Sequence, residues 1–266
     1  RPIMSQGAQT LKRVHFELGG KNPVIVFDDA DLDRALDAVV FMIYSLNGER
    51  CTSSSRLLVQ QSIHDKFVDA LASRVEQIKV GHPLDPATEL GPLIHPDHHS
   101  KVCSYMAVGA EEGATVRVGG EALDKAGGCY FQPTLLTGVS GAMRVAREEI
   151  FGPVLCVVRV GSLDDAMQLI NDHEYGNGTC LFTRDGEAAR RFTDGIEVGM
   201  VGVNVPLPVP VAYHSFGGWK RSLFGDLHAY GPDSVRFYTR RKAVSQRWPS
   251  VSEATRAEFS FPTNQR

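Results

Sequence analysis

The stretch Val24-Ile25-Val26-Phe27 is a short apolar run, and a helical pattern over residues 32–46 separates it from a second run, Arg56-Leu57-Leu58-Val59. An apolar strand, a helix and another apolar strand in succession are typical of a parallel sheet covered by helices. The same alternation continues along the chain, with strands predicted at residues 14–18, 24–27, 56–59, 115–118, 154–160, 180–183 and 201–205. We therefore expect an α/β fold with a largely parallel, twisted sheet.

The clearest predicted helix covers residues 63–78. Ile63, Phe67, Leu71 and Val75 recur at intervals of four residues, while charged residues occupy the opposite side. This pattern is typical of a helix that buries one face against a core. Further helices are predicted over residues 3–11, 32–46 and 163–170.

The composition is that of an ordinary soluble globular protein: of 266 residues, 42% are hydrophobic and 22% are charged. The longest apolar run, residues 38–44, is far shorter than the roughly 18 residues that a membrane span needs. A net charge of −3 does not favour general binding to nucleic acid. The five cysteines are odd in number and form no C-x-x-C pair, which favours a reducing compartment and predicts a cytoplasmic protein.

The C-terminal region mixes basic and aromatic residues. The run from Val235 to Lys242 reads as a strand, and we assign residues 234–248 to an oligomerisation strand that pairs across subunits of a homo-oligomer. Single-stranded nucleic acid is the alternative partner for such a mixture, but the net acidic chain favours the subunit contact. Residues 249–266 are polar and are predicted to form a loose tail.

Two motifs do not support the sites that they superficially indicate. Gly19-Gly20-Lys21-Asn22 lacks the earlier glycine and the following Ser or Thr of a phosphate-binding loop. His95, His98 and His99 cluster with Asp97 at the start of a predicted helix, where solvated polar residues are common, so we do not expect a metal site.

A carboxylate and a cysteine form a more informative pair. Glu17 lies near the end of a short apolar strand, and Cys51 follows a glycine-broken helix directly after Arg50. The positive charge of Arg50 would favour a thiolate at Cys51. The alternative is that Cys51 is a small buried hydrophobe and Glu17 a solvated surface residue.

Three segments in order resemble signatures of the aldehyde dehydrogenase superfamily: Glu-Leu-Gly-Gly-Lys at 17–21, Gly-Glu-Arg-Cys at 48–51 and Glu-Glu-Ile-Phe-Gly-Pro-Val at 148–154. Supporting similarities occur at residues 90–94, 133–135 and 216–220. The resemblance implies that Cys51 is the nucleophile and Glu17 the general base. The thiolate would add to an aldehyde, hydride would pass to NAD, and water activated by Glu17 would hydrolyse the resulting thioester.

The same resemblance assigns a cofactor site. Glu149 matches the carboxylate that holds the ribose of the nicotinamide half of NAD, and Phe151 matches an aromatic residue that positions it. Leu18 and Gly19 match the stretch that runs beside the nicotinamide. The choice between NAD and NADP stays open.

The two parts of the chain resemble different semialdehyde dehydrogenases. Residues 16–61 are similar to 5-carboxymethyl-2-hydroxymuconate-semialdehyde dehydrogenases, whereas residues 175–179 and 197–249 are similar to methylmalonate-semialdehyde dehydrogenases, which pass the acyl group to coenzyme A. The presence of Glu17 favours water as the acyl acceptor, and coenzyme A is the alternative. Both groups act on carboxylate-bearing semialdehydes, so Arg50 is a candidate partner for that carboxylate or else part of a structural ion pair. Phe216 is a further candidate for substrate binding.

The resemblance also predicts the domain organisation. Residues 1–19 would be the remnant of a dinucleotide-binding domain and residues 20–233 a catalytic domain. Most of the NAD site would then be missing, so we expect this polypeptide alone to bind NAD weakly and to oxidise aldehyde little. The alternative from another class is a non-enzymatic binding fragment in which Cys51 is merely buried.

Overall fold

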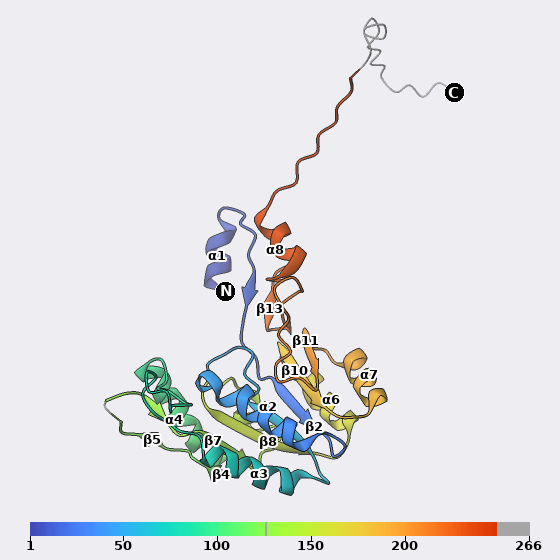
Figure 1. The fold of residues 1–266 in the computed structure, drawn as a ribbon. Helices are drawn as coiled ribbons and strands as arrows, with labels where there is room; N and C mark the ends of the chain where they lie inside the picture. The colour runs from blue at the N-terminus through green and yellow to red at the C-terminus, as the bar shows by residue number, and fades with distance from the viewer. Residues whose placement is uncertain (126, 249–266) are drawn as a thin grey trace, which may run out of the picture.

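The structure, a computed structural model, describes residues 1–125 and 127–248 of the chain (Figure 1). Its helices are α1 (Pro2–Ala8), α2 (Leu32–Tyr44), the 3-10 turn η1 (Ser45–Gly48), α3 (His64–Glu76), α4 (Pro96–Glu111), α5 (Arg144–Arg147), α6 (Leu163–Asn171), α7 (Gly186–Gly195) and α8 (Gly231–Tyr238). Its strands are β1 (Phe16–Glu17), β2 (Pro23–Val26), β3 (Arg56–Gln60), β4 (Thr115–Val118), β5 (Ala122–Leu123), β6 (Tyr130–Phe131), β7 (Thr134–Thr137), β8 (Val154–Val160), β9 (Tyr175–Gly176), β10 (Gly178–Phe182), β11 (Met200–Val203), β12 (Trp219–Lys220) and β13 (Leu223–Phe224).

A seven-stranded sheet in the order β11-β10-β2-β3-β8-β7-β4 forms the centre of the molecule. Every neighbouring pair is parallel except β4 with β7. The central strands are buried along nearly their whole length, as expected for a parallel sheet with helices on both faces. The predicted α/β fold is therefore confirmed.

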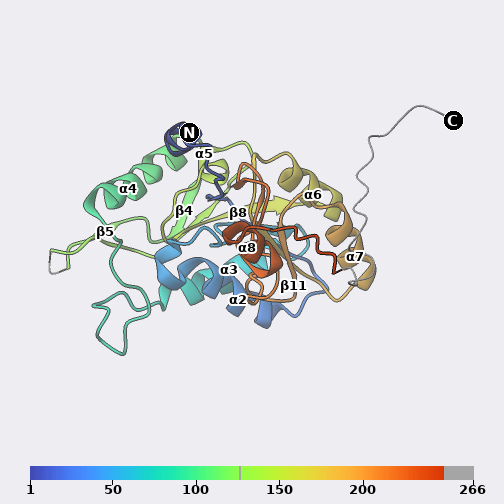
Figure 2. The ribbon, with the colours of Figure 1, turned by 90° about the horizontal axis from the view of Figure 1, so that it is seen from above.

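Alternate residues of each strand enter two different hydrophobic clusters. In β2, Val24 and Val26 pack with α2 and α3, whereas Ile25 packs with α4 and α6 on the other face. Figure 2 shows α2 and α3 on one side of the sheet and α4 and α6 on the other. Because successive side chains of a strand point to opposite faces of the sheet, each central strand contributes to both hydrophobic clusters.

The predicted strands were placed well wherever they were continuous apolar runs. Six of the seven fall on strands of the main sheet, while the predicted strand at 14–18 forms only β1, which pairs with β13 outside that sheet. Strand β7 was not predicted, because its sequence Thr-Leu-Leu-Thr is short and half polar and follows Pro133 directly.

The predicted C-terminal strand is wrong over residues 235–238, which form the end of helix α8. Pro232 lies in the first turn of this helix, where its fixed φ is favourable, and Asp233 pairs with Arg236 at 3.0 Å one turn later. Residues 239–248 form neither helix nor strand within the single chain, so pairing of this segment across subunits stays a prediction. The predicted tail, 249–266, lies outside the described residues.

Across residues 1–125 and 127–248, no helix combines the length and the apolar character needed to cross a bilayer.

Candidate active site

The turn that carries Cys51 depends on an unusual backbone at the end of α2. Leu46, Asn47 and Gly48 have φ values of 54°, 58° and 69°, so three successive residues are left-handed. At Gly48 an added Cβ would lie 2.2 Å from the carbonyl oxygen of Gly152. This close approach requires glycine, and the turn directs the chain through Cys51 into strand β3.

Replacing Gly48 with alanine should lower the free energy of unfolding by about 1–3 kcal/mol, because the new methyl group meets backbone and the left-handed φ disfavours a side chain. Urea denaturation measures this change. Gly186→Ala is the matched control, since an added Cβ there meets nothing within 4 Å, and it should cost no stability. Equal stability of the two variants would contradict a special requirement at Gly48.

Two buried asparagines hold the carbonyl group of Cys51. The Nδ2 of Asn22 donates to this oxygen at 2.7 Å, and the Nδ2 of Asn177 donates to it at 2.9 Å. Gly20 makes the arrangement possible, since an added Cβ would lie 2.8 Å from the Asn22 Oδ1 and 3.0 Å from the Asn177 Cβ. The amino end of β10 and the segment before β2 thus fix the position of the half-buried Cys51.

Burial raises the pKa of the Cys51 thiol, and a hydrogen bond from the Asn177 side chain partly offsets this effect. The negative charges of Glu149 and Glu17 raise the pKa further.

Glu149 is near Cys51 through Gly20, whose N–H donates to the Glu149 Oε1 at 3.0 Å and whose added Cβ would lie 3.5 Å from the Cys51 carbonyl oxygen. The Glu17 segment reaches the same region through Ser222, which binds the carbonyl of Gly19 and the N–H of Gly176, next to Asn177. The catalytic roles of Cys51 and Glu17 and the cofactor role of Glu149 stay predictions.

Arg50 is turned toward the C-terminus of α2. Its Nη2 donates to the carbonyl oxygen of Met42 at 2.9 Å and to the hydroxyl of Ser45 at 2.8 Å, and the guanidinium lies over the Phe41 ring. Burial lowers the pKa of Arg50, and the charge interaction with Cys51 raises it in part. These contacts indicate a structural role for Arg50, in which its partners are carbonyl groups of α2 and not an acidic side chain. The contact of Arg50 with a substrate carboxylate stays a prediction.

Glu17 lies in β1, and its side chain is 22% exposed. Its Oε1 is 2.9 Å from the Nε2 of His15. Burial raises the pKa of Glu17, whereas His15 lowers it through its charge and its hydrogen bond. A carboxylate with a raised pKa next to an imidazole is suited to accept a proton from water.

The predicted cofactor residues also lie together. The backbone N–H of Gly20 donates to the Oε1 of Glu149 at 3.0 Å, and a Cβ on Gly19 would lie 2.0 Å from the other carboxylate oxygen. Burial raises the pKa of Glu149. Phe151 has a φ of 61°, and its carbonyl oxygen is 2.6 Å from the Nε2 of His98. The Glu149 carboxylate lies against the backbone of Gly19 and Gly20. A carboxylate is a hydrogen-bond acceptor that can bind the hydroxyl groups of a ribose.

Leu18 is exposed next to Gly19, and its backbone N–H donates to the carbonyl oxygen of Ser222 at 2.9 Å. Phe216 stacks on Tyr230, with ring centroids 5.0 Å apart. Phe216 precedes the Gly217-Gly218 pair, and Gly218 packs against Asn177. Its predicted contact with substrate stays a prediction.

Sequence reasoning missed Asn22, Asn177, His15 and Ser222 as parts of this site. The fully buried Ser222 donates its hydroxyl to the carbonyl of Gly19 at 2.8 Å and accepts the N–H of Gly176 at 3.1 Å. It therefore ties the Glu17 segment to the strand next to Asn177. Of these four residues, only Asn177 had a signal in the sequence: it is an asparagine between two glycines, directly before a buried strand.

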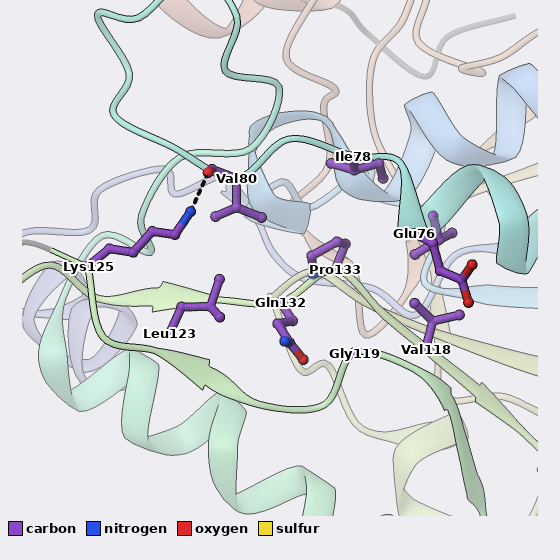
Figure 3. A pocket seen from close by; sticks show the side chains of 10 residues that line it. Glu76, Ile78, Val80, Val118, Gly119, Leu123, Lys125, Gln132 and Pro133 are labelled. Atoms are coloured by element: carbon purple, nitrogen blue, oxygen red, sulfur yellow. Dashed lines mark hydrogen bonds between the residues drawn. The ribbon is translucent and has the colours of Figure 1, made fainter.

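A groove of about 380 Å³ lies between α3, β4 and β5 (Figure 3). It is lined mainly by apolar side chains, together with Glu76, Lys125 and Gln132. None of the predicted site residues lines it. The groove is therefore separate from the Cys51 site.

A sequence model of the aldehyde dehydrogenase family matches residues 1–244. The malonate-semialdehyde dehydrogenase of Pseudomonas aeruginosa is 52% identical over 265 residues, which make up 98% of this chain and 53% of that protein. The chain thus spans about half the length of the curated relatives that it matches.

Solved structures of semialdehyde and aldehyde dehydrogenases also superpose on this chain. The methylmalonate-semialdehyde dehydrogenase of Oceanimonas doudoroffii superposes with a TM-score of 0.90 at 49% identity, covering 94% of this chain and 52% of that one. The betaine aldehyde dehydrogenase of Staphylococcus aureus, solved in complex with NAD⁺, superposes with a TM-score of 0.85 at 39% identity, covering 89% of this chain and 47% of that one.

Proposed function

This chain belongs to the aldehyde dehydrogenase family, and from that premise we propose that it supplies the catalytic thiol for NAD-dependent oxidation of a carboxylate-bearing semialdehyde. The observation that carries the proposal is that hydrogen bonds connect the segments of Glu17 and Glu149 to the half-buried Cys51. Ser222 joins the Glu17 segment to the segment of Asn177, Asn177 binds the Cys51 carbonyl, and Glu149 accepts the N–H of Gly20. Such a group can combine a nucleophile, a base and a cofactor ligand.

The first half of the reaction forms a bond to Cys51. Its thiolate adds to the aldehyde carbon and produces a tetrahedral oxyanion. When the C=O bond re-forms, a hydride leaves, and the carbon is oxidised to a thioester. NAD, when bound, supplies the acceptor for this hydride. Glu149, Gly19 and Phe151 are the residues that would hold it.

The second half releases the acyl group. Glu17 removes a proton from water, the hydroxide adds to the thioester, and the carbon–sulfur bond breaks to return the Cys51 thiolate and a carboxylic acid. The His15 contact at 2.9 Å orients the Glu17 carboxylate for this role. Coenzyme A is the second candidate acceptor, supported by the 49% identity to a methylmalonate-semialdehyde dehydrogenase over 94% of this chain.

The names of the relatives support a short semialdehyde as substrate. The Pseudomonas aeruginosa protein is a malonate-semialdehyde dehydrogenase and the Oceanimonas doudoroffii protein a methylmalonate-semialdehyde dehydrogenase. Both names describe an aldehyde with a carboxylate nearby. We therefore place malonate semialdehyde first among the substrates to be tested, with NAD as the cofactor.

Labelling of Cys51 with iodoacetamide tests the proposal on the chain itself. We expect Cys51 to react at least about tenfold faster than Cys156 and Cys180, because both of these are fully buried and burial raises the pKa of Cys180 to about 12. Malonate semialdehyde should slow the labelling of Cys51 without any NAD, since reversible thiohemiacetal formation occupies the sulfur. Peptide mass spectrometry measures each rate.

Cys103 and Cys129 are partly exposed, so the experiment uses a Cys103→Ser, Cys129→Ser background. Propanal, which lacks the carboxylate, should protect Cys51 less than malonate semialdehyde does. Inert Cys51, or equal labelling with and without aldehyde, would support the non-enzymatic binding fragment instead.

A further inference from the structure

Two cationic side chains are buried together where the parallel strands β2 and β3 begin. Lys21 and Arg56 are each 2% exposed. Arg56 stands opposite Pro23 in the register of β3 with β2, and its backbone N–H donates to the carbonyl of Asn22 at 3.4 Å. Lys21 precedes Pro23 by two residues, and residues two apart in an extended chain share a face. Lys21 and Arg56 therefore extend from the same face of the sheet.

Neither cation has an acceptor in the part of the chain that the structure describes. The Nζ of Lys21 and the Nε of Arg56 are buried without a hydrogen-bond partner. Neither side chain forms an ion pair with any residue of 1–125 or 127–248. Buried charges in proteins are normally paired, because removing an ion from water is costly.

The neighbouring groups that could carry a negative charge are engaged elsewhere. Cys156 stands opposite Arg56 in the register of β3 with β8, and its Sγ donates to the carbonyl of Val145 at 3.0 Å. A sulfur that donates a hydrogen bond is a thiol and not a thiolate, and burial raises the pKa of Cys156. Glu149 accepts the N–H of Gly20 at 3.0 Å. The charge of Arg56 thus has no counter-ion in the chain.

Loss of a proton would relieve Lys21 but not Arg56. Burial lowers the pKa of Lys21, and the charge of Arg56 lowers it further. Burial lowers the pKa of Arg56 to about 10, with a contribution from the charge of Arg147, so the guanidinium stays charged at pH 7. The pKa of His173 is lowered to about 3, through burial first and then through the charge of Arg56. The interior therefore contains a positive charge that an anion would neutralise.

We propose that Arg56 and Lys21 together bind a chloride ion inside the folded protein. The Nε of Arg56 is fully covered, so the two terminal nitrogens of the guanidinium would contact the ion, and the Lys21 ammonium adds a second positive charge. Both side chains are almost completely buried, which favours a monatomic ion over phosphate or an organic anion. Chloride here would stabilise the junction of β2 and β3 whatever chemistry Cys51 performs.

Thermal unfolding at pH 7 tests the proposal, in sodium chloride and in sodium gluconate at constant ionic strength. A ligand that binds only the folded state stabilises it by mass action. The midpoint should therefore rise by about 3–5 °C for each tenfold increase in chloride above its dissociation constant. Gluconate is too large for the site, so it should give no comparable rise.

Arg56→Met should abolish the difference between the two salts. Lys21→Met should require at least about tenfold more chloride for the same rise, because one of the two charges is lost. Lys220→Met is the matched control, since Lys220 is also largely buried but its Nζ donates to the carbonyl of Asn171 at 2.6 Å and lies 3.5 Å from Glu197. This variant should keep the full response to chloride even if it loses stability.

Far-UV circular dichroism checks that each variant folds. If Arg56→Met does not fold, Lys21→Met decides, because it replaces an unpaired buried charge with an apolar chain of similar length. Crystals soaked in bromide should show an anomalous peak at the terminal nitrogens of Arg56. Equal midpoints in chloride and gluconate, an unchanged chloride response in both folded variants, or no bromide peak at Arg56 would overturn the proposal.

Discussion

Cys51→Ala should abolish the rapid release of p-nitrophenolate that we expect when the protein is mixed with p-nitrophenyl acetate. The ester transfers its acetyl group to the thiolate, so that a carbon–sulfur bond forms as nitrophenolate leaves, and no NAD is needed. Loss of the nucleophile should lower the rate by about 10³-fold or more, toward the rate in buffer. Stopped-flow absorbance measures the burst.

Cys156→Ala and Cys180→Ala are the controls. Both residues are fully buried in the two hydrophobic clusters, so these variants should keep the burst even if they lose some stability. A burst that survives Cys51→Ala, or that disappears in a folded Cys156→Ala variant, would place the nucleophile elsewhere.

The sequence predicted the sheet because its central strands are continuous apolar runs that are buried on both faces. It failed for α8, where Val235 and Phe237 alternate as in a strand. The proline and the ion pair that stabilise the first turns of the helix are local features that outweigh this alternation. Strand β7 was missed for the opposite reason, since only its position between β8 and β4 buries it.

The site could be predicted only as far as its motifs extend. Cys51, Glu17 and Glu149 stand in segments that resemble a known family. The contact from Asn177 to Cys51 joins residues 126 positions apart, and the contact from Ser222 to Gly19 joins residues 203 positions apart. No local pattern indicates such pairs, because they depend on how β9, β10 and β13 meet in the folded chain.

These contacts connect the residues that act in the two halves of the proposed reaction. Ser222 binds the carbonyl of Gly19 and the N–H of Gly176, and the next residue along, Asn177, binds Cys51. The base segment and the nucleophile are thus connected through hydrogen bonds that are buried or partly buried. Accurate placement of this kind is what a two-step acyl transfer requires.

Glu17→Gln should leave the nitrophenolate burst intact and nearly remove the steady-state turnover that follows. Glutamine keeps the size of the side chain and an oxygen for the His15 contact, but it cannot take a proton from water. Turnover should fall about 10²–10⁴-fold, the range typical of a positioned general base. Acetylated protein should then accumulate and be detectable by intact mass spectrometry.

The pH dependence of turnover also tests Glu17 as the general base. Glu17 acts as a base only when it is ionised, and burial raises its pKa above the ordinary range of a glutamate. Turnover of the unmodified protein should therefore rise with pH through that raised pKa, and Glu17→Gln should lack this rise. Addition of coenzyme A distinguishes water from coenzyme A as the acyl acceptor. If coenzyme A restores turnover in Glu17→Gln and acetyl-coenzyme A forms, transfer of the acyl group to the coenzyme A thiol is favoured. Unchanged turnover in this variant without coenzyme A would contradict Glu17 as the base, because water would then attack the thioester without it.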